Sequence, residues 1–107
     1  YDPAFEEYGP PKPAGLVCCI DVLEHIEPNL LENVLDDLAS ITVNFGFFSI
    51  HMGPASKVLA DGRNAHLIQK PTSWWLPKIS EHFDVLHLQS HNIMGNGFWI
   101  FVKRRTT

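Results

Sequence analysis

The chain of 107 residues lacks any long apolar run, and it has few charges. No hydrophobic stretch approaches the roughly 20 residues that a membrane-spanning helix needs, so the sequence predicts no membrane span. Charged side chains make up 19% of the residues and the net charge is −4, which offers no broad basic surface for nucleic acid. Because 45% of the residues are hydrophobic, we expect a folded globular domain rather than a disordered chain.

Cysteine is also scarce, and the two that are present, Cys18 and Cys19, are adjacent. Neighbouring residues of a strand point to opposite faces, which disfavours a disulfide between them. We therefore expect two buried, reduced thiols and a cytoplasmic compartment.

Two kinds of catalytic motif are missing. The six histidines show neither an HExxH motif nor the Cys/His spacing of a zinc finger, so their spacing predicts no metal site. No serine stands in a GxSxG motif, so a hydrolase triad has no support.

A glycine-rich turn after a strand is missing as well. A nucleotide-type cofactor site on an α/β sheet needs such a turn, because the backbone must approach the cofactor closely. Of the seven glycines only Gly95 and Gly97 are closely spaced, and they belong to a predicted hairpin. The sequence therefore contains no loop that would cradle such a cofactor.

Residues 1–14 are predicted to be an irregular connector. Four prolines in this stretch withhold backbone donors and restrict their neighbours. The chain begins with Tyr1 in loop-like sequence, so we expect a fragment in which residues 15–107 are the C-terminal part of a larger domain.

The rest of the chain alternates between strand and helix patterns. The continuous apolar run from Leu16 to Ile20 is typical of a strand buried on both faces. The predicted elements are a strand (16–20), a helix (from 28), a strand (45–51), a polar loop (53–70), a short helix (71–83) and a hairpin of two strands (84–91 and 97–103). This order favours an α/β fold with a parallel pair of strands, a C-terminal antiparallel hairpin and flanking helices.

Polar side chains follow the first two predicted strands. Asp21 ends the first strand, Glu24 and His25 come directly after it, and His51 ends the second. In parallel sheets ligands bind beyond the carboxyl ends of the strands, so a site is expected there. Asp21 favours a functional role, because an acid at the end of a buried strand is costly without a partner. For His25 a ligand-binding role and a purely structural role both remain open.

The polar loop offers further candidates. Arg63, Asn64 and His66 could project toward the same rim as Asp21, although an ordinary surface turn explains them equally well. We expect Trp74 and Trp75 to pack against the sheet, and an aromatic wall over a pocket remains open.

The motif CIDVLEHIEPN (residues 19–29) resembles the segment after the fourth strand of class I S-adenosylmethionine (SAM)-dependent methyltransferases. GRNAH followed by WW (residues 62–75) is similar to a subgroup of bacterial and phage-type methyltransferases. The likeness extends over essentially the whole chain. It implies a Rossmann-like sheet of order 3-2-1-4-5-7-6, of which this chain would supply about four strands, with the glycine-rich loop upstream of Tyr1.

The resemblance also implies site residues. Asp2 matches the acid that binds the cofactor ribose, and His25 or His66 would serve as a base if the acceptor must lose a proton. The residues that would line the cofactor and the substrate are Asp21, Val22, Leu23, Glu24 and His25.

From the resemblance we expect a truncated SAM-dependent methyltransferase that acts on an unknown acceptor in its complete form and is inactive as this fragment. The alternative is a non-catalytic, methyltransferase-like remnant that serves as an oligomerising or interaction module. Without the first three strands of the family sheet, the strand at 16–20 would be left with an open edge. We therefore expect a homo-oligomer, such as a dimer, and neither a membrane nor nucleic acid as a partner.

Overall fold

A computed structural model of the chain describes residues 13–92 and 95–105. Asp2, the ribose-binding acid that the family resemblance implies, lies outside these ranges. The elements are β1 (Ala14–Ile20), η2 (Leu23–His25), η3 (Pro28–Leu30), α1 (Leu31–Ile41), β2 (Thr42–His51), α2 (Thr72–Ser80), β3 (Phe83–His91) and β4 (Gly97–Arg104). Strands and helices follow one another in the predicted order, and two short 3-10 helices fill the connection between β1 and α1.

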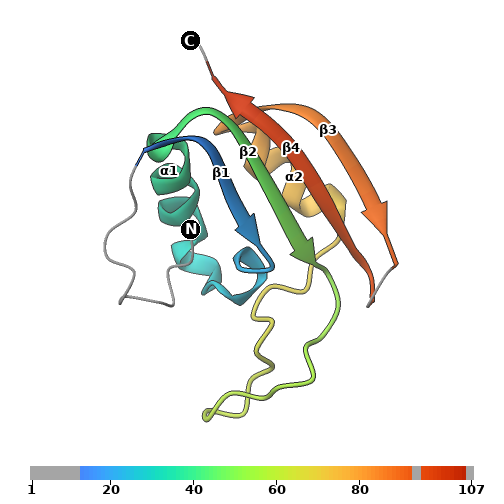
Figure 1. Ribbon diagram of the computed structural model, residues 1–107. Helices are drawn as coiled ribbons and strands as arrows, with labels where there is room; N and C mark the ends of the chain where they lie inside the picture. Colours follow the sequence, from blue (N-terminus) through green and yellow to red (C-terminus); the bar gives the residue numbers. More distant parts are fainter. Residues whose placement is uncertain (1–12, 93–94, 106–107) are drawn as a thin grey trace.

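The four strands form one sheet in the order β1-β2-β4-β3 (Figure 1). β1 and β2 run parallel, whereas β4 is antiparallel to both β2 and β3. The predicted mixed α/β fold, with its parallel pair and C-terminal hairpin, is therefore confirmed. The order also equals the 4-5-7-6 part of the sheet that the family resemblance implies.

β2 begins earlier than the sequence pattern predicts. The pattern suggests a start at Phe45, but the strand begins at Thr42, directly after the last residue of α1. The Thr42 hydroxyl donates a hydrogen bond of 2.7 Å to the Leu38 carbonyl, which satisfies an acceptor in the last turn of the helix. Thr42 also pairs with Ala14, so the two parallel strands are joined from their first residues.

The hydrophobic core lies between the sheet and the two helices. In α1 the buried residues Leu31, Leu35 and Leu38 recur at helical spacing, and α2 contributes Trp75 and Ile79. Burying one such side chain fully stabilises a fold by about 1.5–3 kcal/mol, so the contact between the helices and this face of the sheet stabilises the domain. Neither described helix is long and apolar enough to cross a membrane.

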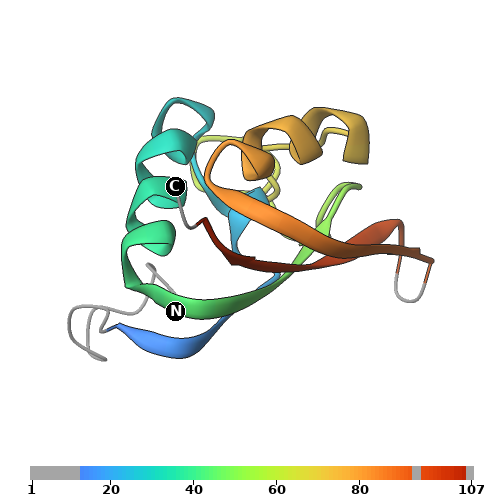
Figure 2. The ribbon, with the colours of Figure 1, turned by 90° about the horizontal axis from the view of Figure 1, so that it is seen from above.

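The opposite side of the sheet is exposed. Both helices pack on one side (Figure 2), and among the described residues no element covers the other. The prediction that the first strand is buried on both faces is therefore wrong. Leu16 and Ile20 are 55% and 51% exposed, while Val17 and Cys19 are buried.

The two cysteines follow the same alternation along β1. Cys18 is exposed and Cys19 is buried, and they form no disulfide. The prediction of two buried thiols is therefore half right. We call the exposed side of the sheet the open face, and its apolar residues are Leu16, Cys18, Ile20, Phe45, Phe47, Trp99 and Phe101.

Residues 52–71 form the long connection between β2 and α2. This segment lies beyond the carboxyl ends of β1 and β2 (Figure 1), and it contains an isolated bridge between Val58 and Asn64. The Ile68 amide donates a hydrogen bond of 3.0 Å to the Glu24 carbonyl. The connection is thereby held against η2, at the edge of the sheet where a site is expected.

Candidate functional site

The candidate site begins with Asp21, at the carboxyl end of β1. Its φ of 52° lies in the left-handed region, which non-glycine residues adopt uncommonly and Asp more readily than most. Three contacts join it to Ser49 on β2. Its backbone amide donates to the Ser49 carbonyl over 3.0 Å and to the Ser49 hydroxyl oxygen over 3.1 Å, and its carboxylate accepts from the Ser49 hydroxyl over 2.9 Å. These contacts hold the turn that carries the chain from β1 into η2, and the Asp21 side chain is exposed there.

Glu24 lies in η2, three positions after Asp21, and is fully buried. Its Oε2 accepts a hydrogen bond of 3.1 Å from the His51 amide, while its Oε1 has no hydrogen-bond partner among the described residues. Burial raises the pKa of Glu24 to about 7, and hydrogen bonds from its own amide and the His51 amide oppose this rise. A carboxyl group with such a pKa can exchange a proton near neutral pH.

Three histidine rings surround this part of the site. The rings of His25 and His66 meet edge to face with centroids 4.7 Å apart, and the rings of His51 and His66 are 4.9 Å apart. The structure thus brings together His25 and His66, the two candidate bases, from segments that are 41 positions apart in the sequence.

Backbone carbonyls set the tautomers of two of these histidines. Nδ1 of His25 lies 2.9 Å from the Ala65 oxygen, and Nδ1 of His66 lies 2.7 Å from the Gly53 oxygen. A carbonyl oxygen can only accept, so each Nδ1 carries the hydrogen and the Nε2 of the neutral ring keeps its lone pair. Both rings are therefore held in a state in which Nε2 can accept a proton or coordinate an ion.

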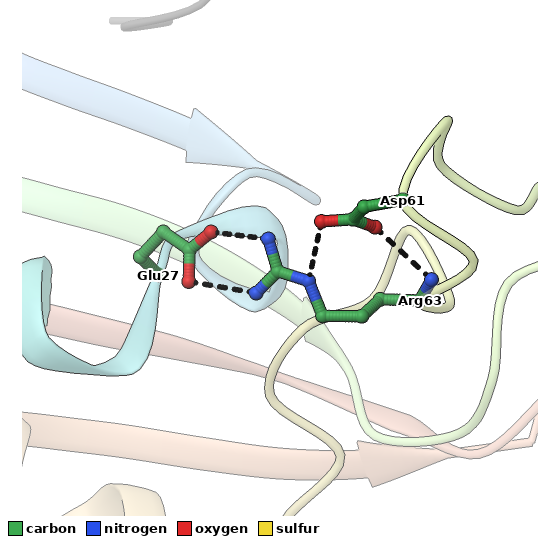
Figure 3. A network of polar contacts seen from close by, with 3 residues as sticks. All are labelled: Glu27, Asp61 and Arg63. Carbon is green, nitrogen blue, oxygen red and sulfur yellow. Dashed lines mark hydrogen bonds and ion pairs between the residues drawn. The ribbon is translucent and has the colours of Figure 1, made fainter.

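Arg63 is held by two carboxylates. It makes a two-pronged ion pair with Glu27, with distances of 2.9 and 2.7 Å, and its Nε donates to Asp61 over 2.8 Å (Figure 3). The Arg63 side chain holds the pKa of Glu27 below its ordinary value, and bonds from the Arg63 amide and side chain do the same for Asp61. Arg63 thus ties the loop to the segment that follows η2.

Asn64 has a similar structural role inside the loop. Its Oδ1 accepts hydrogen bonds of 2.9 Å from the amides of Ala55 and His66, and its Nδ2 donates to the Ala55 carbonyl. It therefore shapes the turn that presents His66 to the other histidines. Of the remaining candidates, Leu23 is fully buried in the core and Val22 is partly buried against it.

Some contributors to the site are hard to find from the sequence. His51 is visible there only as a strand-end residue, although its amide binds Glu24 and its ring packs against His66. Gly53 contributes only backbone groups, for which a side-chain pattern has no signal: its carbonyl oxygen accepts from His66, and its amide donates to Nδ1 of His51.

No protein-family model matches this sequence, and a search of curated proteins found no match. Solved structures do match the fold. Magnesium protoporphyrin IX methyltransferase (ChlM) from Synechocystis PCC 6803 with bound SAM superposes with a TM-score of 0.62 at 13% identity, covering 91% of this chain and 42% of that chain. Its complex with S-adenosylhomocysteine (SAH) gives a TM-score of 0.65 at 14% identity and covers 91% and 48%.

The N-methyltransferase NodS from Bradyrhizobium japonicum WM9 in complex with SAH gives a TM-score of 0.62 at 10% identity, covering 90% of this chain and 48% of that chain. At such identities the similarity shows the fold, which is that of class I SAM-dependent methyltransferases. The present chain spans about half the length of the structures it matches.

Proposed function

We propose that this chain contains the acceptor-side part of a SAM-dependent methyltransferase site, and that the complete protein transfers a methyl group from SAM to an acceptor. The observation that carries the proposal is the position of the polar cluster. Asp21, Glu24, His25 and His66 gather beyond the carboxyl ends of the parallel pair, in a fold shared with structures that hold SAM or SAH. Ligands of open α/β sheets bind at this edge.

Methyl transfer needs the protein mainly to orient SAM and the acceptor relative to each other. A methyl group leaves the sulfonium of SAM by in-line displacement, so the main task is to hold the acceptor atom in line with it. A base is needed only if the acceptor must lose a proton, and the Nε2 lone pairs of His25 and His66 suit that role. The His25 side chain is exposed and would be accessible to an acceptor.

Cofactor binding is the weaker half of the site in this chain. The sequence has no glycine-rich turn after a strand, and Asp2 lies outside the described residues. We propose that tight SAM binding needs such a turn from sequence beyond these 107 residues, and that this chain alone has little or no activity.

Calorimetry with SAH tests the proposal. SAH is titrated into the 107-residue chain and into a chain extended at its N-terminus by the upstream coding sequence. The extended chain should bind SAH and release it on turnover, while the shorter chain should bind weakly. If neither chain binds SAH, the methyltransferase proposal is overturned.

The role of a histidine base is tested separately in the extended chain. His25→Ala and His66→Ala are compared by the rate of SAH release, and at least one of them should reduce it. Unchanged turnover in both variants would remove the base from the mechanism while leaving methyl transfer by orientation alone.

The alternative function is a non-catalytic, methyltransferase-like module that binds partners or copies of itself. The open face favours it, because Leu16, Ile20 and Phe45 are between 42% and 55% exposed. Absence of SAH binding in both chains, together with stable self-association, would support this alternative.

A further inference from the structure

We propose that Glu24, His25 and His66 form a binding site for a divalent transition-metal ion. The proposal does not depend on methyl transfer, because it rests only on the ligand atoms and on their surroundings. It is an alternative to the base role of these histidines, because an Nε2 that coordinates an ion has no lone pair left for a proton. Each of the three residues offers one ligand atom, and these atoms lie within 4.8 Å of one another. In a tetrahedral zinc shell, neighbouring ligand atoms are about 3.3 Å apart, so modest side-chain rotation would close the site around an ion.

The buried carboxylate gives an independent reason to expect a cation. Glu24 is fully buried, and its Oε1 has no hydrogen-bond partner among the described residues. A buried polar atom without a partner destabilises a fold by about 1–3 kcal/mol, so such atoms are rare unless a ligand satisfies them. An ion held beside His25 and His66 would satisfy Oε1.

The orientation of the two histidines fits coordination. Metal-bound histidines almost always donate their second ring N–H to a carboxylate or a backbone carbonyl, which fixes the ring and its tautomer. His25 and His66 already do this through Nδ1, toward the carbonyls of Ala65 and Gly53. Nε2 is then the nitrogen of each ring that can coordinate.

The neighbouring groups are compatible with this assignment. The His51 ring packs against His66 and its Nδ1 contacts Gly53, while the Asp21 carboxylate accepts a bond from Ser49. The donor set is one carboxylate oxygen and two imidazole nitrogens, which suits zinc, iron or cobalt better than calcium or magnesium, because the latter prefer oxygen ligands. Three protein ligands leave at least one coordination position open to water or to an oxygen of a bound molecule.

The second group of potential ligands in the described residues does not have these properties. It consists of Glu32, Glu81 and His82, and both acids are exposed. Both ring nitrogens of His82 already face carboxylates, at 2.9 Å from Glu32 and 3.1 Å from Asp36. This group therefore serves as a matched control for the proposed site.

The proposal departs from the expectation of no metal site that the histidine spacing gave. Glu24 and His25 are adjacent, but His66 comes from the long connection, so no local motif contains the set. The fold alone brings the three together.

Equilibrium dialysis tests the site in the 107-residue chain, purified without a histidine tag and stripped with EDTA. Zn²⁺ should bind at one ion per chain, and Co²⁺ should give the visible absorption bands of a protein-bound ion. His25→Ala and His66→Ala should each weaken Zn²⁺ binding by at least about tenfold. His82→Ala should leave Zn²⁺ binding unchanged.

Glu24→Gln is a third variant, and circular dichroism establishes whether it folds. Because His25 is exposed, His25→Ala keeps the test informative even if Glu24→Gln does not fold. Three results would overturn the proposal: no Zn²⁺ binding by the unaltered chain, retained binding in both histidine variants, or loss of binding in His82→Ala.

Discussion

The burial of Glu24 has a consequence for stability at the scale of single residues. Its pKa rises from an ordinary 4.5 to about 7, chiefly because burial penalises the charged form. At a pH between 4.5 and 7, the Glu24 carboxyl group has lost its proton in the unfolded chain but keeps it in the folded chain. The folded state therefore loses stability as the pH rises from 4.5 to 7, and the loss is constant above that range.

The first prediction follows from this difference. Relative to Glu24→Gln, the unaltered chain should lose on the order of 3 kcal/mol of unfolding free energy between pH 4.5 and 7.5. Urea denaturation at several pH values, in EDTA, measures it. Asp37→Asn, at an exposed position of α1, is the control and should follow the unaltered chain. Parallel curves for Glu24→Gln and the unaltered chain would contradict the prediction.

Asp21 and the histidines show how far single residues could be identified from the sequence. Asp21, Glu24 and His25 stand directly after a strand pattern, so the rule that ligands bind at strand ends identifies them. The position of His66 depends on the path of a long connection and on the bonds that Asn64 makes within it. A sequence pattern contains no information on that path, and so the contact between His66 and His25 could not be predicted.

At the scale of elements, Gly46 is a position in β2 where a side chain would be too close to its neighbours. It is buried on the helix-covered side of the sheet, between Val17 of β1 and Val102 of β4. A Cβ at this position would lie 2.9 Å from Cζ of Phe48 and 3.0 Å from Cγ2 of Val102. Two packed core side chains would have to shift to admit a methyl group.

The second prediction is therefore that Gly46→Ala destabilises the fold by about 1–3 kcal/mol, the usual range for overpacking. Gly15→Ala is the matched control, because the nearest atom to its Cβ would be Nδ2 of Asn44 at 3.7 Å, an ordinary contact. Thermal denaturation of both variants provides the comparison. Equal melting temperatures would show that the core around β2 relaxes at little cost.

The elements were predictable for a physical reason. The short continuous apolar run in β1 is typical of a strand, the apolar residues of α1 recur with the period of a helix, and the short link after β3 favours an antiparallel neighbour. The coverage of each face was not predictable in the same way. A continuous apolar run such as 16–20 is consistent with burial on two faces, but burial depends on which helices pack there, and α1 and α2 share one side.

At the scale of the whole molecule, the open face and the edge of β1 are the features that most need a partner. Leu16 and Ile20 are 55% and 51% exposed, and the stacked rings of Phe45 and Phe101 extend the apolar surface across the sheet. β1 is also an edge strand, so one side of its backbone has no strand beside it within the described part of the chain. Both features favour association with a second copy of the chain.

The last prediction is that the chain forms a dimer in solution, with a mass twice the 12.1 kDa of the monomer. Light scattering over a range of protein concentrations measures this mass. Phe45→Lys places a charge on the open face and should shift the equilibrium toward the monomer, because a buried charge without a partner is costly. Val58→Lys, on the exposed long connection, is the control and should leave the dimer intact. A monomeric mass for the unaltered chain at high concentration would mean that the open face is stable in water without a second copy.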